Sequence, residues 1–521
     1  MIVSMRRQTA VLLAVVLALV GLAGSPATAS QGDQSPVTAI VSLTAGASTS
    51  ALHGVHIVSQ LPRLGAVVVS GTESALRSLR GRSGIRGITP NYKLRPTSND
   101  NNPGSDSVYA GTQLGGRVAT DGAGAGVTVA VVDTGVSDTP SLNRASGRLI
   151  DGLDASGTGS VADGFGHGTF MANLVAGGRA PGSGNNTLGV APAADVVNVK
   201  VADSNGDTSL DQVLFAFSWV DYFADHIDIL EFAFSGPRPG SAYGPDPLTD
   251  AVERLRADGV LVVVASGNVA GELGDPGFDP YALTVGAADL RRSARPHVAD
   301  FSGYGDVYGV SKPDVVASGV GVLSIMPADS TIARANPQSL QPNGLYRGSG
   351  TSQSTAITAG LAATVLQRYP NATPADLKAT LRSTANPIDG AGSGQGVVKV
   401  PQRLFPADAR GHKNAGTGEG DLDTAAWLAH SWLDGAWVEA NNAAWDAQTW
   451  RGQTWRGQTW GAQTWRGQTW RGQTWLGQTW LGQTWLAQTW QGQTWSAQTW
   501  AAQSWRAQSW GGQLWAARAW S

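Results

Sequence analysis

The chain has 521 residues, too many for one ordinary hydrophobic core, so two or more structural units are expected. Its formal net charge of −3 favours neither nucleic acid nor an acidic partner. It contains no cysteine, which excludes disulfides and cysteine-ligated metals as the means of holding the fold together.

Residues 1–29 have the pattern of a secretory signal peptide. Arg6 and Arg7 form a basic start, residues 10–23 an apolar core, and Ala27-Thr28-Ala29 a small-residue cleavage site. The alternative is an uncleaved anchor, but the apolar run is short for a membrane span. No later stretch reaches the ~18 uninterrupted apolar residues of a spanning helix. We therefore expect export, with no transmembrane anchor in the mature chain.

Residues 30–96 predict a small α+β unit. Its expected elements are three strands, at 37–43, 65–69 and 85–90, and one helix at 72–79. Residues 97–107 follow, rich in Asn, Asp, Gly and Ser, and their composition predicts an exposed linker.

From residue 108 to residue 404, strand and helix patterns alternate. The expected strands are 127–133, 195–201, 227–234 and 260–265, and the expected helices are 167–176, 209–224, 248–257 and 353–368. Alternation of this kind predicts an α/β unit, with a parallel sheet covered by helices on both faces.

Four polar residues stand at the ends of these elements. Asp133 ends a β-branched run, where open α/β sheets build their sites, and Asn268 closely follows another predicted strand. His167 opens one apolar helical run, and Ser352 lies between a glycine-rich turn and another. A serine at the start of a helix is by itself weak evidence for a nucleophile, because serine is also a common helix N-cap. Together they supply an orienting carboxylate, a base, an amide donor and a nucleophile.

These motifs resemble those of the subtilisin-like serine proteases (subtilases), and the resemblance covers residues 36–402. The chain order Asp, His, Ser is that of subtilisin. Departures lie after the serine, where Gln353 replaces the methionine usual in the family and residues 354–356 also differ. The matching stretches are Val132-Asp133-Thr134-Gly135, His167-Gly168-Thr169, Gly189-Val190-Ala191-Pro192, Ser266-Gly267-Asn268, Lys312-Pro313-Asp314-Val315 and Gly350-Thr351-Ser352.

Peptide hydrolysis gives each catalytic candidate a role. Ser352 is the expected nucleophile, and His167 takes its proton and later gives it to the leaving amine. Asp133 holds the other ring nitrogen of His167 and stabilises the imidazolium. Asn268 and the backbone N–H of Ser352 are the expected donors to the oxyanion. No cofactor is required for this chemistry, and no metal ligand is assigned.

The resemblance also implies how the chain is processed and how it binds substrate. Residues 30–96 resemble an inhibitory propeptide, which implies self-cleavage between Pro96 and Ser107, in the linker and cleavage region 97–107. The stretch 231–236 resembles the family strand that pairs with an extended peptide. Substrate-binding residues are then Ala233, Phe234, Ser235 and Gly267. The alternative is a plain sheet edge ending in a turn.

Residues 203–207 place oxygen ligands at alternate positions, as a calcium loop does. The glycine is misplaced, however, and Leu214 stands where the closing glutamate belongs. A solvated loop is the favoured interpretation. Subtilases often carry structural calcium, so calcium elsewhere in the chain stays open, with no ligands named.

After a polar linker at 405–426, the region 427–521 repeats tryptophan at intervals of five residues, most regularly from Trp445 to Trp520. On an α-helix this interval winds the rings around the axis, and on a strand it alternates them between faces. Neither element gives a one-sided core. Two interpretations stay open: a solenoid with five residues per side, or an irregular adhesive tail.

We expect this region to bind cell-envelope polymers, since exposed indoles form an adhesive surface and the region is weakly basic. Self-association of the repeats is the alternative. Truncation after about Pro406 should leave casein hydrolysis intact and release the enzyme from isolated cell walls into the supernatant. Equal partitioning of the full-length and truncated proteins would contradict tethering.

The sequence thus predicts a secreted, extracellular serine endopeptidase, made as a self-processing zymogen and retained at the cell wall. Its partners are protein or peptide substrates and its own propeptide, and nucleic acid is not among them. The rival class is a surface-binding repeat protein with an inactive protease-like domain. A narrow processing protease is a third alternative, which the sequence does not separate from a broad one.

Overall fold

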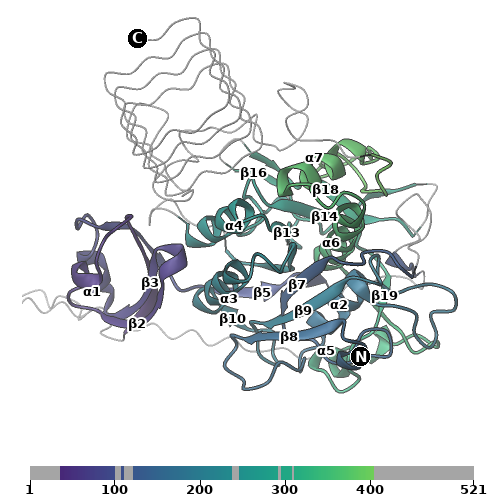
Figure 1. Ribbon diagram of the computed structural model, residues 1–521, viewed down its shortest axis with the longest axis horizontal. Helices are drawn as coiled ribbons and strands as arrows, with labels where there is room; N and C mark the ends of the chain where they lie inside the picture. Colours follow the sequence, from purple (N-terminus) through teal and green to yellow (C-terminus); the bar gives the residue numbers. More distant parts are fainter. Residues whose placement is uncertain are drawn as a thin grey trace, which may run out of the picture.

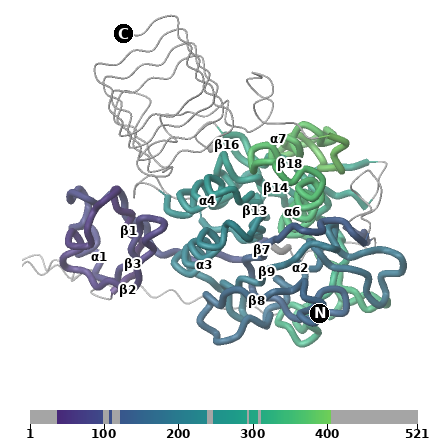
Figure 2. Tube along the Cα trace, viewed as in Figure 1, coloured from purple at the N-terminus to yellow at the C-terminus, as the bar shows by residue number. Residues whose placement is uncertain are grey.

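The protein is described here by a computed structural model that covers residues 36–99, 107–110, 121–237, 246–291, 295–307 and 310–403. It forms two units, a small one in purple and a large one in blue to green (Figures 1 and 2). The predicted signal peptide, residues 100–106, the linker 405–426 and the tryptophan repeat lie outside the described residues. Among the described residues, no helix has the length and apolar character needed to cross a membrane.

The N-terminal unit, residues 36–90, has a core of its own. Its antiparallel sheet has the order β2-β3-β1-β4, and a helix packs on it. The predicted helix is confirmed, with the Thr72 side chain accepting from the Ala75 N–H at its start. Strand β2 was not predicted, because its side chains are mostly exposed and lack an apolar alternation. The elements are β1 (Val37–Leu43), β2 (His56–Leu61), β3 (Ala66–Gly71), α1 (Glu73–Ser78) and β4 (Ile85–Pro90).

The large unit, residues 121–403 as far as they are described, is built on one sheet of the order β15-β14-β13-β11-β7-β9-β8, with β18 pairing beside β14. All pairings are parallel except that of β15. This confirms the predicted parallel α/β sheet. The strands are β7 (Thr128–Asp133), β8 (Leu149–Asp154), β9 (Asp195–Lys200), β11 (Ile229–Phe232), β13 (Leu261–Ala265), β14 (Leu283–Asp289), β15 (His297–Val298) and β18 (Val315–Ser318).

Helices cover both faces of this sheet (Figure 1), as the sequence predicts. Along β7, Val129 and Val131 face a core that includes α2, α6 and α7, while Ala130 and Val132 face a core that includes α3 and α4. Since both faces are buried, the strands are continuous apolar runs. The helices are α2 (His167–Ala176), α3 (Leu210–Tyr222), α4 (Pro247–Ala257), α5 (Thr331–Ala335), α6 (Thr351–Arg368) and α7 (Pro374–Thr384).

Two element boundaries differ from the prediction, and both bear on function. The expected strand 227–234 is interrupted at Ala233, where the backbone leaves the sheet, and resumes as β12 (Phe234–Ser235). Helix α6 begins at Thr351 and not at Gln353, so Ser352 lies inside its first turn. Its backbone N–H is therefore among those that the helix leaves without an internal acceptor.

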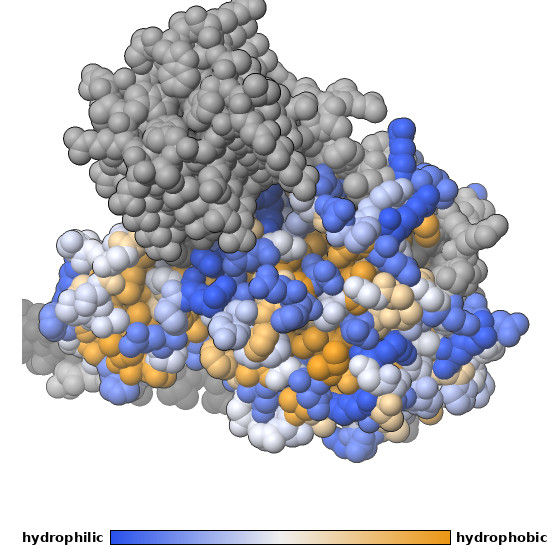
Figure 3. All heavy atoms as spheres, in the orientation of Figure 1, coloured by the Kyte–Doolittle hydropathy of each residue, from blue (hydrophilic) through white to orange (hydrophobic). Residues whose placement is uncertain are grey.

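The two units meet through ion pairs as well as apolar contacts. Arg63 pairs with Asp221, and Arg86 pairs with Asp250; both carboxylates are buried. Burial lowers the pKa of Arg86 to about 10, which leaves its guanidinium charged near neutral pH. On the face seen in Figure 3, apolar and polar side chains are interspersed over both units.

Candidate active site

Asp133 and His167 are joined at the carboxyl end of the sheet. Asp133 is the last residue of β7, and His167 is the first residue of α2. The Nδ1 atom of His167 lies 2.8 Å from each carboxylate oxygen of Asp133, and both residues are buried. Asp133 Oδ1 also accepts from the Thr134 N–H at 2.6 Å. The carboxylate can therefore fix the ring tautomer of His167, with Nε2 left for proton transfer.

The start of α2 is held by Asp163, which the sequence analysis did not single out. One oxygen of Asp163 accepts from the Gly166 N–H at 2.7 Å and the Thr134 hydroxyl at 2.8 Å. The other accepts from the Thr169 N–H at 2.8 Å and from its hydroxyl at 2.7 Å. Burial nonetheless raises the pKa of Asp163. Asp163 replaces a conventional N-cap, because Gly166 has no side chain to cap the helix.

Helix α2 approaches β7 so closely that only glycine fits beside His167. A Cβ atom on Gly168 would collide with the carbonyl oxygen of Gly135 and lie 3.1 Å from the Cβ of Asp133. Instead, the Gly168 N–H donates to the Thr134 hydroxyl at 2.9 Å. This contact explains physically why a glycine follows the histidine in the His-Gly-Thr motif.

Ser352 is buried, and its hydroxyl is engaged by the N-terminal part of the chain. Its Oγ lies 2.7 Å from the Oγ1 of Thr97 and donates to the carbonyl of Ala233 at 3.2 Å. His167 Nε2 is buried without a hydrogen-bond partner among the described residues. In this conformation the serine is thus bonded to Thr97 and Ala233 and not to the histidine.

The side-chain amide of Asn268 points toward Thr97. Its Oδ1 accepts from the Thr351 N–H at 3.0 Å and from the Thr351 hydroxyl at 2.9 Å. With Oδ1 occupied, the Nδ2 group donates to the carbonyl oxygen of Thr97. The Ser352 N–H also points to this oxygen, at a longer 3.5 Å. Two donors thus converge on one peptide carbonyl next to a serine hydroxyl, which is the geometry of an oxyanion hole.

The residues before Thr97 form a strand that pairs with the large unit on both of its edges, and the place that it occupies between β10 and β12 is called the cleft below. β5 (Lys93–Pro96) is antiparallel to β10 (Thr208–Ser209) on one side and to β12 on the other. The Thr97 N–H then donates to the Ala233 carbonyl at 2.9 Å. Leu94 is fully buried, in a core to which both units contribute.

The chain continues through the cleft beyond Thr97. β6 (Ser98–Asn99) pairs antiparallel with β20 (Tyr346–Gly350), so that Ser98 lies opposite Gly350 and Asn99 opposite Ser349. The expectation of an exposed linker from residue 97 is therefore wrong at its start, because Thr97 is only 5% exposed. Composition indicated a polar loop there, but backbone pairing in a cleft does not depend on side-chain polarity.

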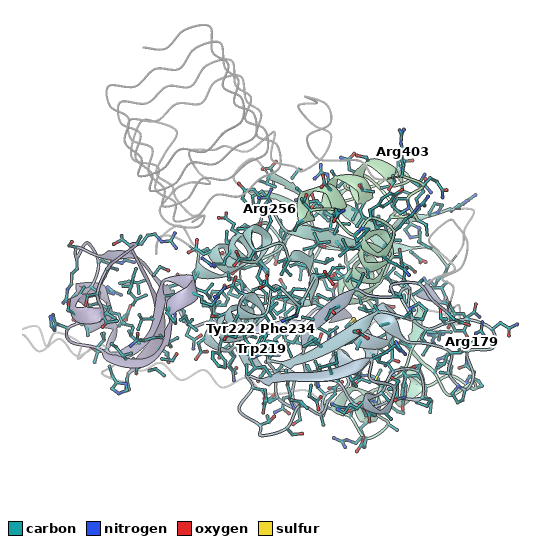
Figure 4. The ribbon with its side chains drawn as sticks, in the orientation of Figure 1. Arg179, Trp219, Tyr222, Phe234, Arg256 and Arg403 are labelled. Atoms are coloured by element: carbon teal, nitrogen blue, oxygen red, sulfur yellow. The ribbon has the colours of Figure 1, made fainter. Side chains whose placement is uncertain are left out.

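The predicted substrate-binding residues lie around this strand. Phe234 and Ser235 pair with Pro96 and Arg95. The Phe234 ring, labelled in Figure 4, is buried edge-on to His167, with centroids 6.1 Å apart. Gly267 lies beside them with φ of +100°, and its carbonyl accepts from the backbone N–H of Gly303 at 2.8 Å.

The loop at residues 203–207, considered above as a calcium site, forms hydrogen bonds within itself and ion pairs with β5. Asp203 accepts from the backbone N–H groups of Asn205 at 2.8 Å and Asp207 at 3.1 Å. Asp207 forms ion pairs with Arg95 and Lys93 of the cleft strand. Within the described ranges, no group of three or more His, Cys, Asp or Glu side chains has a metal-binding arrangement.

Comparison with known proteins agrees with this geometry. A sequence profile of the "Subtilase family" matches residues 124–419, more than half of the chain. The chain belongs to the subtilase family. It is a serine endopeptidase of that family, whose members need no cofactor for catalysis and many of which bind structural calcium.

Several relatives have similar sequences. Serine protease AprX of Bacillus subtilis (strain 168) is 34% identical over 330 residues, which cover 60% of this chain and 72% of that protein. Subtilisin Savinase of Lederbergia lenta is 34% identical over 279 residues, 53% of this chain and 90% of that protein. Alkaline elastase YaB of Bacillus sp. (strain YaB) has the same identity over 279 residues, and there the match spans 64% of the relative.

A solved structure shares the fold. Fervidolysin from Fervidobacterium pennivorans, a keratinolytic enzyme related to subtilisin, superposes with a TM-score of 0.56 at 23% sequence identity. The superposition covers 71% of this chain and 61% of that chain.

Proposed function

We propose that the chain is a self-processing zymogen whose first substrate is its own bond between Thr97 and Ser98. In this proposal Asp133, His167 and Ser352 form the catalytic triad, and Asn268 and the Ser352 N–H bind the oxyanion. One observation carries the proposal: the Thr97 carbonyl oxygen accepts from Asn268 Nδ2 and faces the Ser352 N–H, while the Ser352 hydroxyl lies beside the same residue.

Cleavage proceeds from this arrangement by a short rearrangement. The Ser352 hydroxyl turns from the Thr97 hydroxyl to His167 Nε2, gives up its proton there and attacks the Thr97 carbonyl carbon. Negative charge develops on the carbonyl oxygen, where both donors already point. The bond to the Ser98 nitrogen breaks as His167 returns the proton to that amine. Water then hydrolyses the acyl group from Ser352 by the same steps.

After cleavage, residues 36–97 are an inhibitor. The N-terminal unit retains its ion pairs through Arg63 and Arg86, and β5 still fills the cleft between β10 and β12. Substrates bind when this segment leaves. We propose that they are proteins or peptides that pair with β10 and β12 as extended strands, and that the enzyme acts outside the cell.

The first residue of the mature enzyme tests the proposal. N-terminal sequencing of active, secreted protein is expected to begin at Ser98, because the Thr97 carbonyl occupies the donor pair. Two controls guard against trimming by other proteases: the chain is expressed in a protease-deficient host, and the earliest cleavage product is sequenced. An earliest product that begins before Ser98, or well after it, would contradict the assigned bond.

A further inference from the structure

Tyr92, the sixth residue before the Thr97–Ser98 bond, is bound by a buried carboxyl of the large unit. Its hydroxyl donates to Asp275 Oδ2, and its carbonyl accepts from the Leu210 N–H at 2.9 Å. The ring lies against Gly236, where an added Cβ would come within 2.8 Å of Tyr92 Cε2. Backbone, ring and hydroxyl are thus each contacted by a different residue.

The three contacts just described are all made with residues of the large unit. Tyr92 is not part of the separate core that the N-terminal unit builds between β1 and β4; its ring packs against a core to which both units contribute. The bond to Leu210 extends the pairing of Lys93 with Ser209 by one residue. Any peptide that binds as this strand does would therefore place its sixth residue at the same spot.

Two backbone hydrogen bonds to Gly236 hold Asp275 in place. Its backbone N–H donates to the Gly236 carbonyl at 3.2 Å, and its carbonyl accepts from the Gly236 N–H at 2.9 Å. Its carboxyl is fully buried and feels the charge of Asp246, which accepts from the Leu248 N–H at the start of α4. Burial, and then the charge of Asp246, raise the pKa of Asp275 well above its usual range.

The buried carboxyl of Asp275 offers its Oδ2 atom as an acceptor to one donor from the bound strand. Tyr92 supplies that donor, and burial of its hydroxyl raises the pKa of Tyr92 as well. A phenylalanine ring would fill the same space but leave this buried oxygen without its donor. A short side chain would lose both the ring contact and the hydrogen bond.

We propose that Asp275 makes the mature enzyme select its substrates by the sixth residue before the cleaved bond, with tyrosine the preferred occupant. Asp275 is then a specificity-determining residue at the floor of an outer subsite formed with Gly236. The inference rests on the proposed function, because the subsite is counted from the Thr97–Ser98 bond. It favours a narrow processing protease over one that cuts without regard to sequence.

A peptide series tests the proposal without altering the enzyme. Mature enzyme, freed of residues 36–97, is given fluorogenic peptides with the sequence of residues 91–102, in which position 92 is Tyr, Phe or Ala. The Tyr peptide is expected to have about tenfold higher kcat/KM than the Phe peptide, the value of one hydrogen bond to a buried carboxyl. A Tyr-to-Phe ratio near one overturns the inference.

Two enzyme variants assign the effect to the subsite. Asp275→Leu keeps the branching at Cγ and removes both acceptor oxygens, so its Tyr-to-Phe ratio should fall toward one. Gly236→Ala places a methyl group in the ring site, so it should reduce kcat/KM for the Tyr and Phe peptides more than for the Ala peptide. If Asp275→Leu does not fold, the Gly236→Ala variant and the wild-type peptide series still test whether the enzyme selects the residue at position 92.

The outcomes separate the two proposals. If the peptides are cut between positions 97 and 98 but at equal rates, selection at position 92 is wrong and the proposed function stands. A Tyr-to-Phe ratio retained in Asp275→Leu likewise overturns the role of Asp275. If no peptide is cut at that bond, the proposed function itself is wrong.

Discussion

A Ser352→Ala chain is expected to keep the bond between Thr97 and Ser98 intact and to show no hydrolysis of casein. The substitution removes the only atom of this residue that can form the acyl bond, and the expected loss in kcat is about 10⁶-fold. Alanine fits the space of the serine and gives up only the hydroxyl contacts to Thr97 and Ala233, so the fold should be retained. Gel mobility and N-terminal sequencing of the purified chain check maturation, and casein clearing checks activity.

Ser354→Ala is the matched control for this variant. Ser354 is a buried serine of the same helix, but its hydroxyl donates to the Ala317 carbonyl at 3.0 Å, away from the cleft. Its loss should cost about 1 kcal/mol of stability and leave maturation in place. Normal maturation of Ser352→Ala, in material free of other proteases, would contradict self-processing.

Asn268→Ala is expected to lower kcat by about 10²–10³ with little change in KM. The Nδ2 group donates to the Thr97 carbonyl, and a donor there acts most strongly when that oxygen carries charge in the transition state. Steady-state kinetics on one peptide substrate, with kcat and KM determined separately, measure the effect. An unchanged kcat would show that Asn268 is not an oxyanion donor.

Thr351→Val gives a graded comparison. It removes the hydroxyl that donates to Asn268 Oδ1 at 2.9 Å but leaves the backbone N–H, which donates to the same oxygen at 3.0 Å. Asn268 should therefore keep its orientation in most molecules. We expect a loss in kcat well below that of Asn268→Ala. A loss as large as that of Asn268→Ala would mean that the hydroxyl, and not the backbone, orients the amide.

The sheet and its covering helices were predictable because their signal is local. The strand ending at Asp133 and the helix beginning at His167 are each marked by an apolar run next to a polar residue, and the structure has both at the predicted residues. The parallel arrangement followed from the alternation of elements. The four polar candidates lie at element ends, where sequence periodicity changes, and so they could be found without a structure.

Residues that act through distant contacts could not be found in this way. Thr97 lies in a polar stretch typical of a loop, and its bond to Ser352 joins residues far apart in the chain. Asp163 stands in an irregular segment, with no periodic pattern to relate it to the start of α2. Asp275 comes close to Tyr92 only when the N-terminal segment lies in the cleft. Such contacts depend on tertiary packing, which a local pattern does not encode.

The short connection between the N-terminal unit and the cleft has a kinetic consequence. Strand β4 ends at Pro90, seven residues before Thr97, and Arg63 and Arg86 hold the unit against its own large unit. The proposed scissile bond is thus presented at a high effective concentration within one molecule. The first cut should then be first order, with a half-time that does not change with protein concentration. Release of the cut segment is a dissociation, so dilution favours it and helps to determine when the enzyme begins to act on other chains.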